Sequence, residues 1–224
     1  MFTLNRNDFH GADTNRLVEF VECWNRYYGG DDDEYLAALN LGNDLTKPHI
    51  ARLLRWKDPR FLTRRNRDDA PNLRVERVLA QTVAINDFRN GRIDAGDFET
   101  LTRSIFPNGI IWQLFLFHIA RPRDWPIADR NVFHSYSALF NVDIPDSIVA
   151  YRSYANAFHK LASTLRRAMR IDNTDLTRVV MANKRLDNAL VAFGQFLGTY
   201  DDREPIVGRE RRERLSHHDW SGDA

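Results

Sequence analysis

Apolar residues recur three to four positions apart along most of the 224-residue chain, whereas the alternating pattern typical of strands is almost absent. This spacing predicts amphipathic helices. The first carries Leu17, Phe20, Val21 and Trp24 on one face and ends at Gly29-Gly30. We therefore expect an all-α protein with a compact multi-helix domain.

The same pattern predicts eight further helices. They are expected at about 36–41, 48–58, 75–90, 95–106, 110–120, 129–140, 147–165 and 176–197. Asp94 and Asp146 precede two of them and are expected to be N-caps. The run Ile110 to Ala120 has almost no polar face, so we expect it at the centre of the core. Arg60 to Asn72 is polar, rich in arginine and predicted to be an exposed loop.

Composition limits the class of protein. Hydrophobic residues make up 43% of the chain, enough for one core, and we expect a single helical domain over 1–200 followed by a polar tail over 201–224. Cys23 is the only cysteine, which excludes an intramolecular disulfide and favours a reducing compartment. No run approaches the roughly 18 apolar residues of a membrane span. These features predict a cytoplasmic protein without a membrane partner.

The net charge of +1 does not by itself indicate a nucleic-acid partner, but basic residues are clustered. Arg52 to Arg77 holds nine basic and four acidic residues, a local excess of five. A second basic cluster contains Lys160, Arg166, Arg167 and Arg170. Such clusters suit a phosphate-binding surface, and they equally suit two solvated helix faces.

Two segments around the apolar run carry the chemical suggestion. Phe106-Pro107-Asn108-Gly109 precedes it, and Trp125-Pro126-Ile127-Ala128-Asp129-Arg130-Asn131-Val132 follows it. Together they resemble the helix-hairpin-helix superfamily of DNA glycosylases, in which a hairpin starts a buried helix that leads to an aromatic-Pro-Ile/Val-x-Asp-x-x-Val segment. The resemblance covers about 30 residues. Lys184 to Leu190 with Phe193-Gly194 is also similar to uncharacterised bacterial proteins that look like this fold.

The resemblance implies a DNA-binding protein that excises a modified or damaged base, with Asp129 as its catalytic carboxylate. Such a carboxylate stabilises the oxocarbenium-like charge that develops when the glycosidic bond breaks. The remaining candidate DNA contacts are Asn108, Gly109, Arg64, Arg65, Arg67, Arg130 and Asn131. Trp24, Trp56, Trp112 and Trp125 are candidate walls for an extruded base or, alternatively, core residues.

Departures from the family pattern refine this expectation. Ile110 and Ile111 stand where the hairpin would have its second glycine, which puts phosphate binding there in question. The lysine of bifunctional members has no counterpart at residues 110–112, so the resemblance implies a monofunctional enzyme. With one cysteine an iron–sulfur cluster is excluded, and we expect no cofactor and no metal.

Two other interpretations remain open. Asp129 follows Pro126 at a helix start, where an Asp is frequently only an N-cap, and His118 inside the apolar run is most simply a core histidine. The chain is then a non-catalytic helical module that binds DNA or a protein, or a structural protein without a nucleic-acid partner.

Overall fold

The computed structural model describes residues 14–30, 32–60, 73–143 and 147–203. All regular structure in these ranges is α-helical, which confirms the all-α prediction. The helices are α2 (Thr14–Asn25), α3 (Asp32–Leu39), α4 (Lys47–Lys57), α5 (Leu73–Ala80), α6 (Thr82–Arg89), α7 (Ala95–Ile105), α8 (Ile110–Ala120), α9 (Arg130–Phe140), α10 (Ile148–Ala168) and α11 (Leu176–Arg203).

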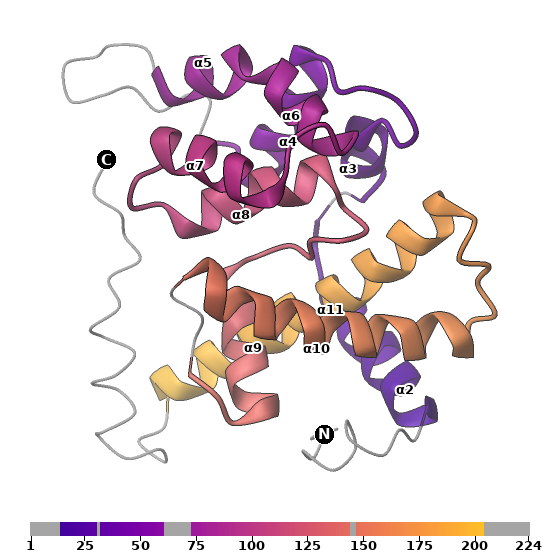
Figure 1. Ribbon diagram of the computed structural model, residues 1–224. Coiled ribbons are helices and arrows are strands. Elements are labelled where there is room, and N and C mark those ends of the chain that lie inside the picture. Colours follow the sequence, from indigo (N-terminus) through magenta and orange to yellow (C-terminus); the bar gives the residue numbers. More distant parts are fainter. Residues whose placement is uncertain (1–13, 31, 61–72, 144–146, 204–224) are drawn as a thin grey trace.

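The helices form two lobes that share one apolar core (Figure 1). The first lobe consists of α3 to α8, and the second of α2, α9, α10 and α11. The chain therefore crosses between the lobes after α2 and again after α8. Asp129 lies at the end of the second crossing, directly before α9.

Helix α8 lies at the centre of the first lobe, as its sequence predicts. Every residue from Gln113 to Ala120 is buried. The ring of Phe88 stacks on that of Phe98 with centroids 4.3 Å apart, and Phe117 of α8 meets the Phe98 ring edge-on at 4.9 Å. A helix buried on all sides needs such partners, because it has no face that can meet water.

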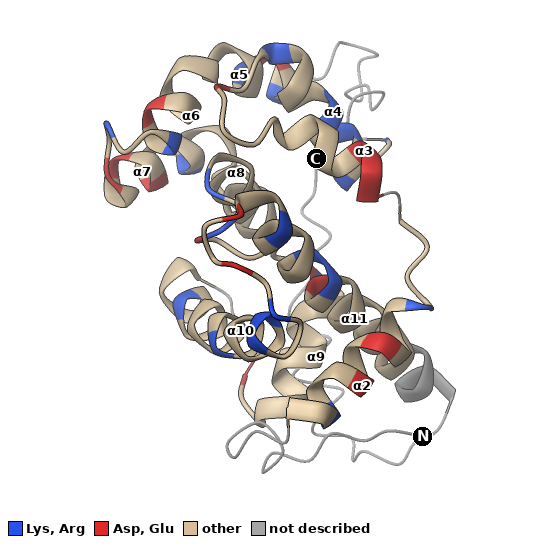
Figure 2. Ribbon diagram, turned by 90° about the vertical axis from the view of Figure 1, so that its right-hand side faces the viewer, with Lys and Arg blue, Asp and Glu red and all other residues tan. Residues whose placement is uncertain are grey.

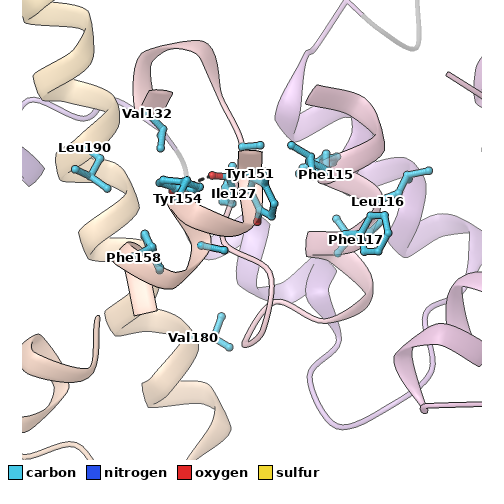
Figure 3. Packing of buried hydrophobic residues seen from close by; sticks show 14 of the residues in the cluster. Phe115, Leu116, Phe117, Ile127, Val132, Tyr151, Tyr154, Phe158, Val180 and Leu190 are labelled. Atoms are coloured by element: carbon cyan, nitrogen blue, oxygen red, sulfur yellow. Dashed lines mark hydrogen bonds between the residues drawn. The ribbon is translucent and has the colours of Figure 1, made fainter. Parts of the chain in front are cut away.

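The second lobe is built on close packing of α11 against α9. A Cβ placed on Gly194 would lie 1.9 Å from the carbonyl oxygen of Asn131, so only glycine permits this approach. Nearby, the hydroxyl of Ser135 donates to the carbonyl of Leu190 at 2.5 Å. These contacts fix the first turn of α9, and with it the residue that precedes it. Figure 3 shows the adjacent apolar packing of Val132, Leu190 and Phe158.

The first two helices, α2 and α3, end earlier than expected, at Asn25 and Leu39, and a later expected helix is broken in two. The helix predicted over 75–90 is interrupted at Gln81, where the Gln81 amide donates to the carbonyl of Val78 and starts a new direction. The expected stripe fails there because Val83 is exposed whereas Ile85 and Phe88 are buried. The spacing of apolar residues is the same in one long helix and in two short helices with different axes, so it does not predict the break.

Three predictions concern residues outside the described ranges. They are the exposed loop, of which residues 61–72 are not described, the Asp146 cap and most of the polar tail. The described N-cap of α10 is Ser147, whose hydroxyl accepts from the Ala150 amide at 3.2 Å. Helix α11 extends to Arg203, three residues into the segment predicted as a tail. In the described part of the chain, no helix combines the length and apolar character that crossing a membrane requires.

Candidate functional site

The segment that leads to Asp129 is held by side chains at four successive carbonyls. His118 donates to Trp125 at 2.6 Å, and Lys57 donates to Ala128 at 3.1 Å. Between them, the hydroxyls of Tyr151 and Tyr154 donate to Pro126 at 2.5 Å and to Ile127 at 3.3 Å. Figure 3 shows both tyrosines of α10 beside Ile127. Because donors from both lobes fix this backbone, the position of Asp129 is determined by the whole fold.

The Asp129 carboxylate has one oxygen in a helix cap and the other in an ion pair. Its Oδ1 accepts from the Asn131 amide at 2.9 Å, which confirms the N-cap interpretation. Its Oδ2 lies 2.9 Å from Nζ of Lys57, which comes from α4 in the other lobe. The Asp129 side chain remains 29% exposed, whereas that of Lys57 is only 10% exposed. The carboxylate is therefore paired but not sealed in the core.

Electrostatics keep this carboxylate ionised at neutral pH. Burial acts to raise the pKa of Asp129, but the charge of Lys57 and hydrogen bonds from Lys57 and Asn131 outweigh it, and the pKa falls below its ordinary value. The negative charge is thus a stable property of the site.

A second lysine–aspartate pair lies on α11. Nζ of Lys184 is 3.1 Å from Oδ2 of Asp187, and the two side chains are 2% and 4% exposed. Lys184 also donates to Oδ1 of Asn188, and Nδ2 of Asn188 donates to Asp32 of α3 at 2.7 Å. The pair on α11 is thereby connected to the first lobe.

Aromatic rings surround the Lys184 ammonium. Its Nζ lies 4.4 Å from the ring centroid of Tyr28, 5.1 Å from that of Trp56 and 5.7 Å from that of Tyr35. The rings of Tyr35 and Trp56 are themselves 4.6 Å apart. A cation among aromatic faces is stabilised by their quadrupoles, which offsets part of its desolvation. We call the group formed by Asp32, Lys57, Asp129, Lys184, Asp187 and Asn188 the seam, since it joins the two lobes.

His118 is a core histidine next to the seam, as one sequence interpretation expects. The Trp125 carbonyl can only accept, so Nδ1 carries the proton and Nε2 accepts from the Tyr35 hydroxyl at 2.6 Å. Burial lowers the pKa of His118 to about 3, with the hydrogen bond to Trp125 opposing the shift and the charges of Lys184 and Lys57 adding to it. The imidazole is therefore neutral and serves to connect α3, α8 and the segment before Asp129.

A turn at residues 107–108 joins α7 to α8. Asn108 is exposed in the turn, where it can meet a ligand. Gly109 is half-buried and is the N-cap of α8, and its amide already donates to the carbonyl of Phe106 at 3.2 Å. The Gly109 amide is therefore engaged within the turn.

Two of the other predicted DNA contacts directly follow Asp129 in the chain. Arg130 is exposed beside Asp129, and Asn131 is half-buried against Gly194. Arg64, Arg65 and Arg67 lie outside the described residues. In the second basic cluster Arg166 donates to Asn183 at 2.7 Å, so this arginine connects α10 to α11. Figure 2 shows Lys and Arg positions in blue on both of these helices.

Of the four candidate tryptophans, only Trp56 lies at the seam. The others pack elsewhere: Trp24 on Phe193 and Phe196, Trp112 on Phe106, and Trp125 between Phe117 and Tyr151. A hollow of about 500 Å³ lies away from Asp129. Its lining includes Asn43, Asp44, Arg89, Arg121, Arg123 and Leu176.

The arginines of this hollow are largely engaged with the protein itself. Arg89 donates to the carbonyls of Leu39, Asn40 and Ile119, and Arg121 donates to the carbonyl of Phe88. They satisfy carbonyls at the ends of α3, α6 and α8. Among the described residues, no group of three or more His, Cys, Asp or Glu side chains is arranged to hold a metal ion.

The sequence did not predict that Lys57 pairs with Asp129, and it predicted no function for Asp187. Lys57 is 72 positions from Asp129, and it was counted only as one basic residue in a cluster. The Lys184-Arg185-Leu186-Asp187-Asn188 segment was a usable signal, because three polar residues there interrupt the apolar stripe of a buried helix.

Comparison of the chain with protein-family models, curated proteins and solved structures found no match.

Proposed function

We propose that this chain is a DNA-binding, monofunctional DNA glycosylase that releases a modified or damaged base. In this reaction the bond between C1′ and the base nitrogen breaks, and the base leaves with the bonding electrons. Water then adds to C1′ with loss of a proton. Asp129 is the carboxylate that stabilises the positive charge on the sugar.

The observation that carries this proposal is the placement of Asp129. It is ionised, partly exposed and rigidly held at the junction of two lobes, where ligand sites preferentially occur. A carboxylate that must stabilise a transient cation needs a fixed position, so that no reorganisation accompanies the reaction. The four bound carbonyls of residues 125–128 supply that rigidity.

The ion pair with Lys57 supports the monofunctional form of the proposal. Nζ of Lys57 donates to both Asp129 and Ala128. An ammonium held in this way is not a nucleophile, because its electron pair carries the proton. Reduction with borohydride during turnover should therefore trap no covalent complex between the protein and DNA.

A panel of duplexes, each with one deaminated, oxidised or alkylated base, tests the proposal. Wild type should release at least one of these bases, and Asp129→Asn should lower the rate about 100-fold or more, in line with the loss of one electrostatic contact in an active site. Asp97→Asn, at an exposed position in the first turn of α7, is the matched control and should retain activity. Equal release by Asp129→Asn and wild type, or no release of any base, would remove the catalytic claim.

A second candidate function is favoured by the full pairing of Asp129. Both carboxylate oxygens are bonded within the protein, which is what a structural cap and a link between lobes require. The chain is then a non-catalytic module that binds DNA or a protein on the same fold. Asp129→Asn should in that case change stability, and a steep loss of DNA affinity between low and physiological salt would identify the DNA-binding form.

A further inference from the structure

The carboxylate of Asp187 has an oxygen that the protein leaves unused. The side chain is 4% exposed, and its Oδ2 is paired with Lys184. Its Oδ1 is buried and has no hydrogen-bond partner among the described residues. Such an acceptor is rare in folded proteins, since burial removes it from water without a replacement bond.

Neighbouring donors are committed to other acceptors. Nζ of Lys184 serves Asp187 Oδ2, Asn188 and the Tyr28 hydroxyl. Lys57 serves Asp129 and Ala128. Neither ammonium lies within hydrogen-bond distance of Oδ1 of Asp187.

A second unused acceptor lies close by on the opposite lobe. Oδ1 of Asp32 is also buried without a hydrogen-bond partner, and it lies 3.6 Å from Nζ of Lys184. Two carboxylate oxygens from α3 and α11 thus lack donors around the same ammonium. This arrangement suits a ligand that presents N–H groups.

The location is that of the proposed active site. Burial raises the pKa of Asp187, the charge and hydrogen bond of Lys184 oppose this shift, and the charges of Lys57 and Asp129, which are near enough to be felt, respectively lower and raise the pKa. Trp56 and Tyr28 are half-buried next to Lys184, and aromatic faces of this kind are what extruded bases stack on.

We propose that Asp187 is a specificity-determining residue, whose Oδ1 accepts a hydrogen bond from an N–H group of the bound base, with Asp32 as a second acceptor. This inference rests on the proposed function and names its substrate class. The site selects bases that carry exocyclic amino or ring N–H donors over bases that lack them. A base with a donor gains a hydrogen bond to the carboxylate, whereas a base without one leaves the buried oxygen unpaired.

The test measures binding and does not depend on catalysis. Two fluorescein-labelled single-stranded oligonucleotides differ only in one central base, either 2,6-diaminopurine, which has two amino groups, or unsubstituted purine, which has none. Anisotropy titrations at low salt should show about tenfold tighter binding of the diaminopurine strand to wild type. Asp187→Asn should bring the ratio of the two affinities close to one, and Asp97→Asn should leave it unchanged.

Each outcome decides the inference. Equal affinities in wild type, no binding of either strand, or an unchanged ratio in Asp187→Asn overturn it. If Asp187→Asn does not fold, the wild-type ratio and the partly exposed Asp32→Asn variant, expected to lower the ratio about threefold, decide instead. Preference for the diaminopurine strand without base release from any duplex supports the inference and removes the glycosylase proposal, whereas base release without this preference does the reverse.

Discussion

Lys57–Asp129 and Lys184–Asp187 lie in the same seam, but the protein treats them differently. In the first pair both carboxylate oxygens are bonded, and the Asp129 side chain keeps 29% of its surface exposed. In the second pair burial is almost complete, yet Asp187 Oδ1 has no partner. The first arrangement keeps a charge ionised and accessible at little cost, whereas the second places an acceptor where water does not compete for it.

The difference shows that a short lysine–carboxylate distance does not define a role. Distances of 2.9 and 3.1 Å describe both pairs almost equally well. The two pairs differ in burial and in whether the second carboxylate oxygen has a hydrogen-bond partner. Both matter because an unpaired polar atom destabilises the protein more when it is removed from water.

The stability of the protein should depend on pH because His118, which lies next to the seam, is buried in its neutral form. The pKa of His118 is about 3 when folded and 6.5 when exposed, so below pH 6.5 the unfolded chain takes up a proton that the folded protein does not. Stability from this group is complete above pH 6.5 and falls by about 1.4 kcal/mol per pH unit, in total about 5 kcal/mol by pH 3.

Urea unfolding between pH 4 and 7 measures this slope. His118→Gln should flatten it, while His159→Gln, on α10, should preserve it. A wild-type stability that is constant over this range would show that water reaches His118, and the contrast in burial would then lose its basis.

Removal of one partner from the buried pair should destabilise strongly. Asp187→Ala leaves the Lys184 ammonium buried beside Asp32 alone, and we expect a loss of about 3–5 kcal/mol in the free energy of unfolding. Asp129→Ala removes a helix cap and a partly exposed ion pair, for an expected loss of about 1–2 kcal/mol. Similar losses in the two variants, measured by chemical denaturation, would contradict the distinction between the pairs.

Glycine substitutions on α11 test how the two pairs are held together. Gly194→Ala would force a Cβ against the Asn131 carbonyl, next to Asp129, and should cost about 1–3 kcal/mol or more. Gly198→Ala on the same helix meets no atom within 4 Å and should stabilise by about 0.5–1 kcal/mol. Thermal unfolding of both variants gives the comparison, and a tolerated Gly194→Ala would mean that α11 can withdraw from α9.

The smallest expected effect is the loss of stability when Asp129 is protonated at low pH. Its pKa lies below the ordinary 3.8, so the stability it contributes is present above that pH and is lost as the pH falls through the folded pKa. Asp129→Asn should therefore reduce the acid dependence of stability below about pH 4, against a background of about 1 kcal/mol from the altered cap. Identical acid titrations of wild type and variant would show that Lys57 does not hold the carboxylate ionised.

Much of the local structure could be read from the sequence. Asp94 caps α7 through the amides of Gly96 and Asp97, and Asp129 caps α9, because a cap forms with amides two or three residues away. The central position of α8 follows from its lack of a polar face. The break at Gln81 was missed, since both of its helices carry apolar residues at helical spacing.

The all-α class, the buried helix and the capped start of α9 can be predicted from the amino-acid sequence, because each depends on interactions within a few residues. Three other features arise from long-range packing. Lys57 contacts Asp129, rings from α4 and the α2–α3 connection enclose Lys184, and one oxygen of Asp187 stays unpaired. These contacts join residues 72 to 156 positions apart. Their formation depends on how two lobes pack, and no local pattern of charge or hydrophobicity encodes that geometry.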